Sequence, residues 1–159
     1  MPQEPRPRIP RVFMDSSSLF AGAASRWGAS RAILMLAEIE LLQIVVCQQV
    51  LDETRRNLME KAPEAMPYFE RITSALKLET VDYPSAEDVA KCKGIIRHVN
   101  DAPILAAAMN AAPDRLVTLN THHFIDDPEV AKRSGLVIQT LGQFMIEIRG
   151  FLTRGYEKV

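Results

Sequence analysis

Three carboxylates and one carboxamide, far apart in the chain, lie at the ends of predicted strands or at the start or side of predicted helices. Asp15 and Asn120 each follow a short apolar run, Asp101 opens a helix, and Glu53 flanks the apolar stripe of another helix. Magnesium and manganese ions take oxygen ligands of this kind, usually a few carboxylates together with water and substrate phosphate. Such an ion lowers the pKa of bound water and stabilises the leaving oxygen during phosphodiester hydrolysis. These residue types therefore indicate a candidate site for Mg²⁺- or Mn²⁺-dependent chemistry.

The stretch 100–124 is expected to supply two of the four site residues, Asp101 and Asn120, together with the helix and the strand that position them. Asn100 or Asp101 is predicted to cap a helix, because a short side-chain oxygen can accept a hydrogen bond from a first-turn amide. The apolar run 116–119 reads as a buried strand, and polar residues from Asn120 onward follow its carboxyl end. Open α/β sheets bind ligands at that edge, so the head of the helix and the end of the strand should meet over one crevice.

The rest of the chain alternates strand and helix signals, which predicts a three-layer α/β/α fold with a central parallel sheet of four to five strands. Polar, small-residue loops are expected at 16–18 and 22–28. Ser30 is expected to cap the helix that follows. We expect strands at 12–14, 43–47, 78–81, 116–119 and 136–140, and helices at 30–41, 49–61, 68–76, 86–93, 101–112, 129–133 and 143–151.

Length and composition indicate one soluble globular domain, with 159 residues of which 47% are hydrophobic and 25% charged. We expect a flexible leader at 1–10, a single domain at 11–150 and a C-terminal tail at 151–159. No apolar run is long enough to span a membrane, and the Pro/Arg-rich start lacks the apolar segment of a signal peptide. Two cysteines without metal-type spacing favour reduced thiols and a cytoplasmic location.

The formal net charge of −1 gives no general signature of nucleic-acid binding. A local basic rim can nevertheless contact a phosphate backbone. Five arginines are candidates for such a rim, although a solvated surface explains each one singly: Arg26, Arg31, Arg55, Arg56 and Arg97.

The sequence gives weaker support to other kinds of site. His122 and His123 invite a zinc site, but adjacent side chains diverge in a strand, and no cysteine pair or third histidine accompanies them. His98, just before Asp101, is a candidate for a phosphate contact or a plain surface residue. The serines at 16–18 lack the Gly-x-Ser-x-Gly context of an esterase nucleophile, and no glycine-rich phosphate loop is present.

Four segments in order resemble the PIN domain family: VFMDSSSLFAG, VLDETRRNL, NDAPILAAA and LVTLNTHHF, within a match from about Arg11 to Thr140. The resemblance implies a parallel sheet flanked by helices and a Mg²⁺- or Mn²⁺-dependent ribonuclease. It implies that Asp15 and Asp101 bind metal directly, and that Glu53 binds a metal or holds its water. Ser17 and Thr118 would be supporting residues.

Asn120 would be a fourth, neutral ligand or a contact to the ligands, where many members of the family carry aspartate. One fewer negative charge should weaken metal affinity, especially for a second ion, and Asp126 is a candidate substitute. The longer 57–72 segment (NLMEKAPEAMPYFERI) looks more like the bacterial branch of the family that includes toxin-like or nucleic-acid-binding proteins than like the shortest VapC toxins. This implies the toxin of a toxin–antitoxin pair, with RNA and an antitoxin as partners and a homodimer as the expected assembly.

Two further functions stay open on the sequence. A catalytically weak or inactive module would keep the fold and bind RNA or a protein, which Asn120 favours. A metal-dependent phosphatase would use the same carboxylates on a small substrate. The retained Asp15, Glu53 and Asp101 favour the ribonuclease.

Overall fold

A computed structural model describes the backbone of residues 8–157 and the side chains of residues 8–154. Within these residues a parallel five-stranded sheet has the spatial order β3-β2-β1-β4-β5. Its strands are β1 (Arg11–Met14), β2 (Gln43–Cys47), β3 (Glu79–Val81), β4 (Arg115–Thr118) and β5 (Ile138–Thr140). The expected α/β class, with a parallel sheet of four to five strands, is confirmed.

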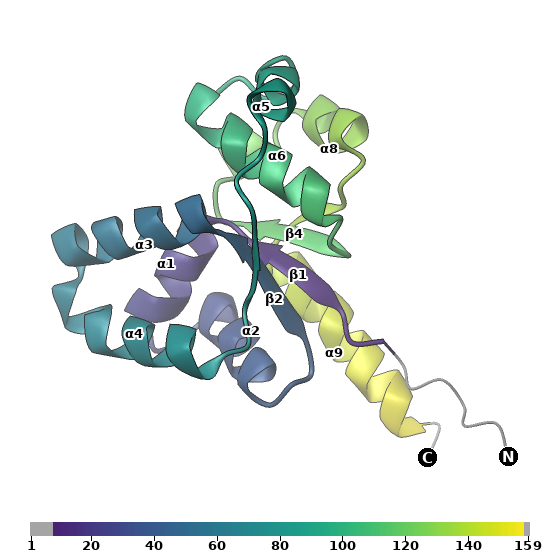
Figure 1. The fold of residues 1–159 in the computed structure, drawn as a ribbon. Coiled ribbons are helices and arrows are strands. Elements are labelled where there is room, and N and C mark those ends of the chain that lie inside the picture. Colours follow the sequence, from purple (N-terminus) through teal and green to yellow (C-terminus); the bar gives the residue numbers. More distant parts are fainter. Residues whose placement is uncertain (1–7, 158–159) are drawn as a thin grey trace, which may run out of the picture.

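The helices form a layer on each face of this sheet. Figure 1 shows α5, α6 and α8 over one face and α1, α2 and α9 over the other, with α3 and α4 packed beside α1. The helices are α1 (Ser16–Ala24), α2 (Ala29–Glu38), α3 (Gln48–Lys61), α4 (Met66–Ala75), α5 (Ala86–Lys93), α6 (Ala102–Ala111), α7 (Thr121–Phe124), α8 (Pro128–Ser134) and α9 (Leu141–Glu157), with 3₁₀ turns η1 (Pro63–Ala65) and η2 (Val99–Asp101).

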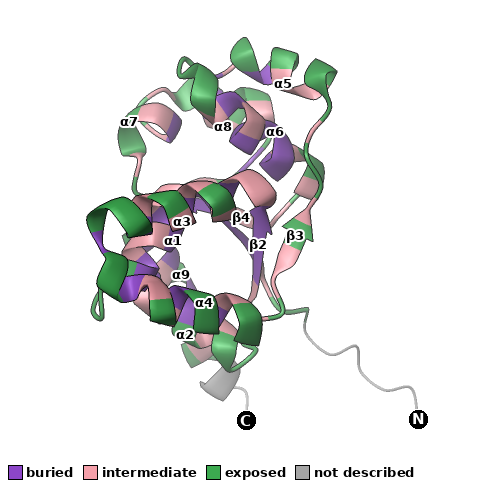
Figure 2. Ribbon diagram, turned by 60° about the vertical axis from the view of Figure 1, so that its left-hand side comes forward, coloured by how far each residue is buried: buried purple, intermediate pink, exposed green. Residues whose placement is uncertain are grey.

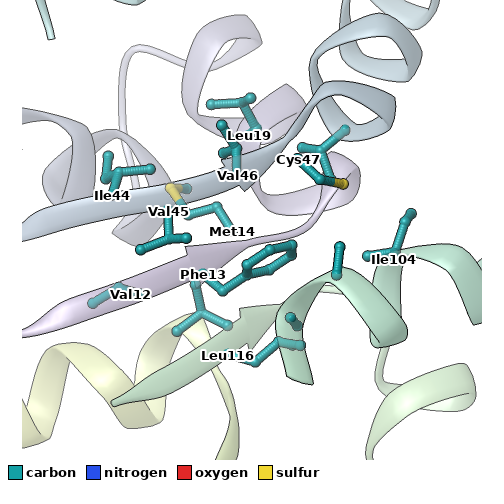
Figure 3. Close-up of a cluster of buried hydrophobic side chains, with 14 of the residues drawn as sticks. Val12, Phe13, Met14, Leu19, Ile44, Val45, Val46, Cys47, Ile104 and Leu116 are labelled. Atoms are coloured by element: carbon teal, nitrogen blue, oxygen red, sulfur yellow. The ribbon is translucent and has the colours of Figure 1, made fainter. Parts of the chain in front are cut away.

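The core lies around β1 and β2, because both faces of these central strands are covered. Phe13 and Met14 of β1 are fully buried, and Figure 3 shows them between the side chains of β2 and Leu116 of β4. The alanines of α6 are buried, and Figure 2 shows the contrast between the buried strand β2 and the exposed outer faces of helices such as α3. Continuous apolar runs suit strands covered on both faces.

The loop expected at 16–18 is wrong, and the loop expected at 22–28 is confirmed only at 25–28. Residues 16–24 form α1, because the Asp15 side chain accepts a hydrogen bond from the Ser18 amide and so caps the helix. Helix α2 begins after Gly28, which has a φ of 105°, and Ser30 lies inside the helix. Serine and other small residues are common in loops, but in this segment they allow α1 and α2 to pack closely together.

Gly22 is the site of that close approach. A Cβ atom there would lie 2.7 Å from Cδ1 of Leu34 and 3.2 Å from the carbonyl oxygen of Ser30. We expect Gly22→Ala to lower the free energy of unfolding, since overpacking costs about 1–3 kcal/mol and exceeds the gain in helix propensity. Gly150→Ala in α9, where a Cβ would meet nothing within 4 Å, should instead raise it by about 0.5–1 kcal/mol. Urea unfolding of the two variants checks this, and an equal gain for both would contradict it.

The ends of the chain differ from the expected boundaries. Residues 1–7 of the predicted leader lie outside the described residues, while 8–10 run irregularly into β1 and Arg8 pairs with Asp114. Helix α9 continues to Glu157, so the predicted tail from residue 151 is helical up to that point. None of the helices in the described part of the chain has the length and apolar character needed to cross a membrane.

Candidate active site

The predicted site residues lie at the point where the connections of the sheet diverge. Neighbouring strands β1 and β4 are parallel, and the chain leaves β1 through α1 toward one face and leaves β4 through α7 and α8 toward the other. Such a divergence opens a crevice at the carboxyl edge, which is the usual ligand site of open α/β sheets. Asp15 directly follows β1, and Asn120 lies two residues beyond the end of β4.

Asp15 is the buried centre of the site, with 3% of its surface exposed. Its Oδ1 accepts hydrogen bonds from the Ser18 amide at 2.9 Å and the Ser18 hydroxyl at 2.8 Å. The Thr118 hydroxyl donates to Oδ2 at 2.5 Å, and Ser17 Oγ lies 2.8 Å and 3.0 Å from the two carboxylate oxygens. Burial raises the pKa of Asp15, although these hydrogen bonds act in the opposite direction. The two predicted supporting residues, Ser17 and Thr118, thus both contact this carboxylate.

Glu53 lies half-buried on α3 and faces the same edge. Its Oε2 accepts a hydrogen bond from the Ser16 hydroxyl at 2.9 Å, and its Oε1 accepts one from Gln49 Nε2 at 2.8 Å. Gln49 Nε2 is also 3.4 Å from the carbonyl oxygen of Asn100. Glu53 is therefore linked on one side to the residue after Asp15 and on the other to the residue before Asp101.

Asp101 does not cap its own helix, which corrects the predicted capping by residue 100 or 101. Its Oδ2 instead lies 2.6 Å from Nδ1 of His123. The same nitrogen is 2.8 Å from Asn120 Nδ2, and Asn120 Oδ1 accepts a hydrogen bond from the His123 amide at 3.3 Å. An imidazole nitrogen either donates or accepts, so Nδ1 of His123 can serve Asp101 or Asn120 but not both. Asn120 also caps the short helix α7, where a loop was expected.

These contacts close into a ring around the carboxyl edge, because the Asn120 amide donates to the Thr118 hydroxyl at 2.8 Å. The ring brings the four predicted residues, which are distant in sequence, onto one perimeter. In order around the ring stand Asp15, Thr118, Asn120, His123, Asp101, the Asn100 carbonyl, Gln49, Glu53 and Ser16, next to Asp15. His123 contributes its backbone amide toward Asn120 and its Nδ1 toward Asp101.

The residue types of this ring suit a hard divalent cation, because carboxylate and amide oxygens are the ligands that Mg²⁺ and Mn²⁺ prefer. The side chains as they stand are bound to protein donors: within residues 8–154, no three His, Cys, Asp or Glu side chains are grouped so that they could hold a metal. Asp101 is held by His123 and Glu53 by Ser16 and Gln49. Release of Asp101 from His123 would free a carboxylate beside the crevice.

Asp126, the candidate substitute for Asn120, lies outside the ring. Its Oδ2 is 3.4 Å from Nδ1 of His122, and its side chain is 63% exposed. Among the described side chains it forms no hydrogen bond with the four predicted site residues. The structure therefore gives no support to Asp126 as the replacement for the missing carboxylate.

Gln49, Ser16 and His123 are members of the ring that the sequence analysis did not assign to this site. Gln49 precedes Glu53 by one helical turn, so its spacing could have indicated a contact. His98 is a third histidine beside His122 and His123, which the sequence did not indicate. The centroid of its ring lies 3.3 Å from that of His123 and 6.0 Å from that of His122. No local pattern predicts that meeting.

Two of the five candidate rim arginines have structural contacts instead. Arg31 donates to the Gly22 and Ala23 carbonyl oxygens at 2.6 Å and 3.1 Å and lies over the ring of Tyr68. Arg55 pairs with Glu70 at 3.0 Å. Arg97 is different, because it lines a pocket together with the three histidines.

The fold and the ring of acidic residues define a PIN-like α/β domain. A family model described as PIN domain matches residues 11–122, and this chain belongs to that family. No curated protein sequence matches the chain significantly.

Two solved structures share the fold. The crystal structure of PAE2754 from Pyrobaculum aerophilum has 15% sequence identity and a TM-score of 0.59, covering 88% of this chain and 90% of that one. VapBC2 from Rickettsia felis, solved bound to a DNA fragment from its promoter, has 19% identity and a TM-score of 0.59, covering 82% of this chain and 98% of that one. At these identities the similarity establishes the fold alone.

Proposed function

We propose that this PIN domain is an endoribonuclease that hydrolyses RNA phosphodiester bonds with Mg²⁺ or Mn²⁺. The observation that carries the proposal is the ring of hydrogen bonds that gathers Asp15, Glu53, Asp101 and Asn120 where the sheet connections diverge. When bound, the ion would lower the pKa of a water molecule and stabilise the leaving oxygen. Family membership supports the same chemistry.

Each residue of the ring would have a distinct role in metal binding or in positioning the attacking water. Asp15 and Asp101 would hold the cation, with Ser17, Ser18 and Thr118 fixing the orientation of the Asp15 carboxylate. Glu53, oriented by Ser16 and Gln49, would bind a second ion or accept a hydrogen bond from the attacking water. Asn120 would contribute a neutral oxygen or position His123.

Cleavage of a pool of structured and single-stranded RNA tests the proposal. We expect cleavage with Mg²⁺ or Mn²⁺ and none with a chelator. Glu53→Gln should reduce it strongly, whereas Asp52→Asn, an exposed acid on the same helix, should not. Cleavage that persists in chelator, or that is equal in the two variants, would overturn the assignment.

Asn120→Asp should raise metal affinity, because a second carboxylate beside Asp101 adds negative charge to the ligand set. The new side chain keeps an oxygen for the His123 amide, so the cap of α7 should persist. We expect the Kd for Mn²⁺, measured by electron paramagnetic resonance, to fall by about tenfold, which corresponds to about 1.4 kcal/mol. An unchanged Kd would place Asn120 outside the ligand set.

We also propose that the chain is the toxin of a toxin–antitoxin pair in the cytoplasm, where Cys47 and Cys92 would stay free thiols. The similar fold of VapBC2 supports an antitoxin partner. Expression should arrest growth, and Asp101→Asn or coexpression of a small neighbouring gene should relieve the arrest. Light scattering on the purified chain tests the expected homodimer, which requires a mass near twice that of one chain.

One observation favours a second function, that of a PIN-fold module that binds RNA or protein without cleaving it. Asp101 is held by His123, and Asn120 stands where many members of the family carry aspartate. RNA binding without cleavage of either RNA or small phosphate esters, at saturating Mn²⁺, would establish this alternative and exclude a phosphatase as well.

A further inference from the structure

We propose that the pocket beside Asp101 is a nucleotide-binding subsite that takes one nucleotide of single-stranded RNA next to the phosphate that is cleaved. This inference rests on the proposed function and adds a substrate contact to it. The pocket, here called the histidine pocket, has a volume of about 410 Å³. Arg97, His98, His122, His123, Asp126 and Asp127 line it.

The histidine pocket collects all three histidines of the chain from two separate segments. The rings of His98 and His123 are stacked, with centroids 3.3 Å apart and an interplanar angle of 18°. His122 meets His98 edge-on at 6.0 Å and 61°. The histidines thus present a nearly continuous aromatic surface, of which His122 is 80% exposed.

The pocket adjoins the candidate active site directly, because His123 is a member of both. Its Nδ1 lies 2.6 Å from Asp101, and its ring forms part of the pocket wall. A nucleotide in the pocket would therefore be separated from the Asp101 carboxylate by one imidazole ring. The pocket is therefore next to the candidate active site, as a subsite for a nucleotide flanking the scissile phosphate has to be.

The chemistry of the walls suits an unpaired nucleotide better than it suits a bare ion. Bases of single-stranded RNA stack on aromatic side chains and on arginine planes, and a cationic side chain contacts the backbone. Arg97 is exposed, and among the described residues it forms no ion pair, so its charge is available for phosphate. Asp126 and Asp127 only accept hydrogen bonds when ionised, so they favour bases with an exocyclic amino group and keep phosphate on the Arg97 side.

A metal ion is the less suitable occupant. In the described part of the chain, the metal-binding residue types nowhere form a group of three or more able to hold an ion, although three histidines and two aspartates line this pocket. The rings of His98 and His123 are occupied in stacking on one another. Arg97 adds a positive charge that repels a cation.

The first test observes the histidine rings themselves. With chelator present, adenosine 5′-monophosphate is titrated at constant pH while the three imidazole Cε1–H resonances are followed by NMR. We expect upfield ring-current shifts of the His98 and His122 signals, smaller shifts with uridine 5′-monophosphate, and little change with inorganic phosphate alone. Equal shifts from phosphate would reduce the pocket to an anion site, and the absence of shifts would overturn the proposal.

The second test compares variants on a fluorescent single-stranded RNA oligonucleotide. Arg97→Ala and His98→Ala should each raise the Kd in chelator by about tenfold, as expected for loss of one phosphate or stacking contact. In Mg²⁺, Arg97→Ala should raise KM with kcat little changed, since the contact is equally present in ground and transition states. Arg149→Ala, in the apolar groove between α2 and α9, is the matched control and should change neither.

The two proposals fail in different ways. Cleavage that depends on metal and on Asp101 but is unaffected by Arg97→Ala and His98→Ala would remove the subsite and leave the nuclease. Nucleotide-induced shifts of the histidine signals without any cleavage would remove the nuclease and leave a nucleotide pocket.

Discussion

Asp101→Asn is expected to abolish metal-dependent RNA cleavage while the fold is retained. Loss of a residue that merely supports a metal ligand costs about 10- to 100-fold in affinity or activity, so loss of a direct ligand should cost about a hundredfold or more. The fold should persist, because the asparagine Oδ1 can still accept a hydrogen bond from Nδ1 of His123, and Asp101 does not cap α6.

Initial rates of RNA cleavage and far-UV circular dichroism together check this expectation. Asp52→Asn serves as the control, since Asp52 is an exposed acid whose partners, Gln48 and Arg55, lie outside the ring. The Kd for Mn²⁺ should rise in Asp101→Asn and stay constant in the control. Cleavage at the wild-type rate in Asp101→Asn would show that the metal, if one is used, lies elsewhere.

Asp15→Asn should also abolish cleavage, and it should have a second, opposite effect on stability in the absence of metal. Burial raises the pKa of Asp15 in the folded chain above its value of about 3.9 in an unfolded chain. Between the two values the folded state binds more protons, so stability falls as the pH rises through that window and stays lower above it. Asparagine removes this loss while its Oδ1 keeps the cap on the Ser18 amide.

Urea unfolding in chelator therefore should show Asp15→Asn more stable than the wild type at neutral pH. The difference should shrink toward zero below about pH 3.9, where Asp15 is protonated in both states. Addition of Mn²⁺ should narrow the difference at neutral pH, because the ion stabilises only the chain that binds it. A variant less stable than the wild type at neutral pH in chelator would mean that the hydrogen bonds of the ionised carboxylate outweigh its burial.

The sheet and most of its helices were predictable because their signals are local. Gln43–Cys47 is a run of apolar, largely β-branched residues, and it forms β2 as expected. Ser85 caps α5, the helix expected at 86–93, by accepting a hydrogen bond from the Asp88 amide three residues on, which is a local interaction. At α1 the local signal was ambiguous, because small and hydroxyl residues suit both loops and closely packed helices. The Asp15 cap and the close approach of Gly22 to Leu34 favour the helix.

The sequence alone determined where the carboxylates lie on their own elements: Asp15 after a short apolar run, Asp101 at the head of a helix and Glu53 beside the apolar stripe of another helix. That the strands and helices carrying them meet at one edge follows from the strand order of the sheet. Only the tertiary structure decided what each side chain binds. The Asp101 side chain could accept a hydrogen bond from an amide of its own helix or from a donor distant in sequence. In the structure, α7 lies against η2, so that Nδ1 of His123 is 2.6 Å from Oδ2 of Asp101. The same packing gathers the three histidines with Arg97, because hydrogen bonds and ring stacking depend on distances in space that residue spacing along the chain does not encode.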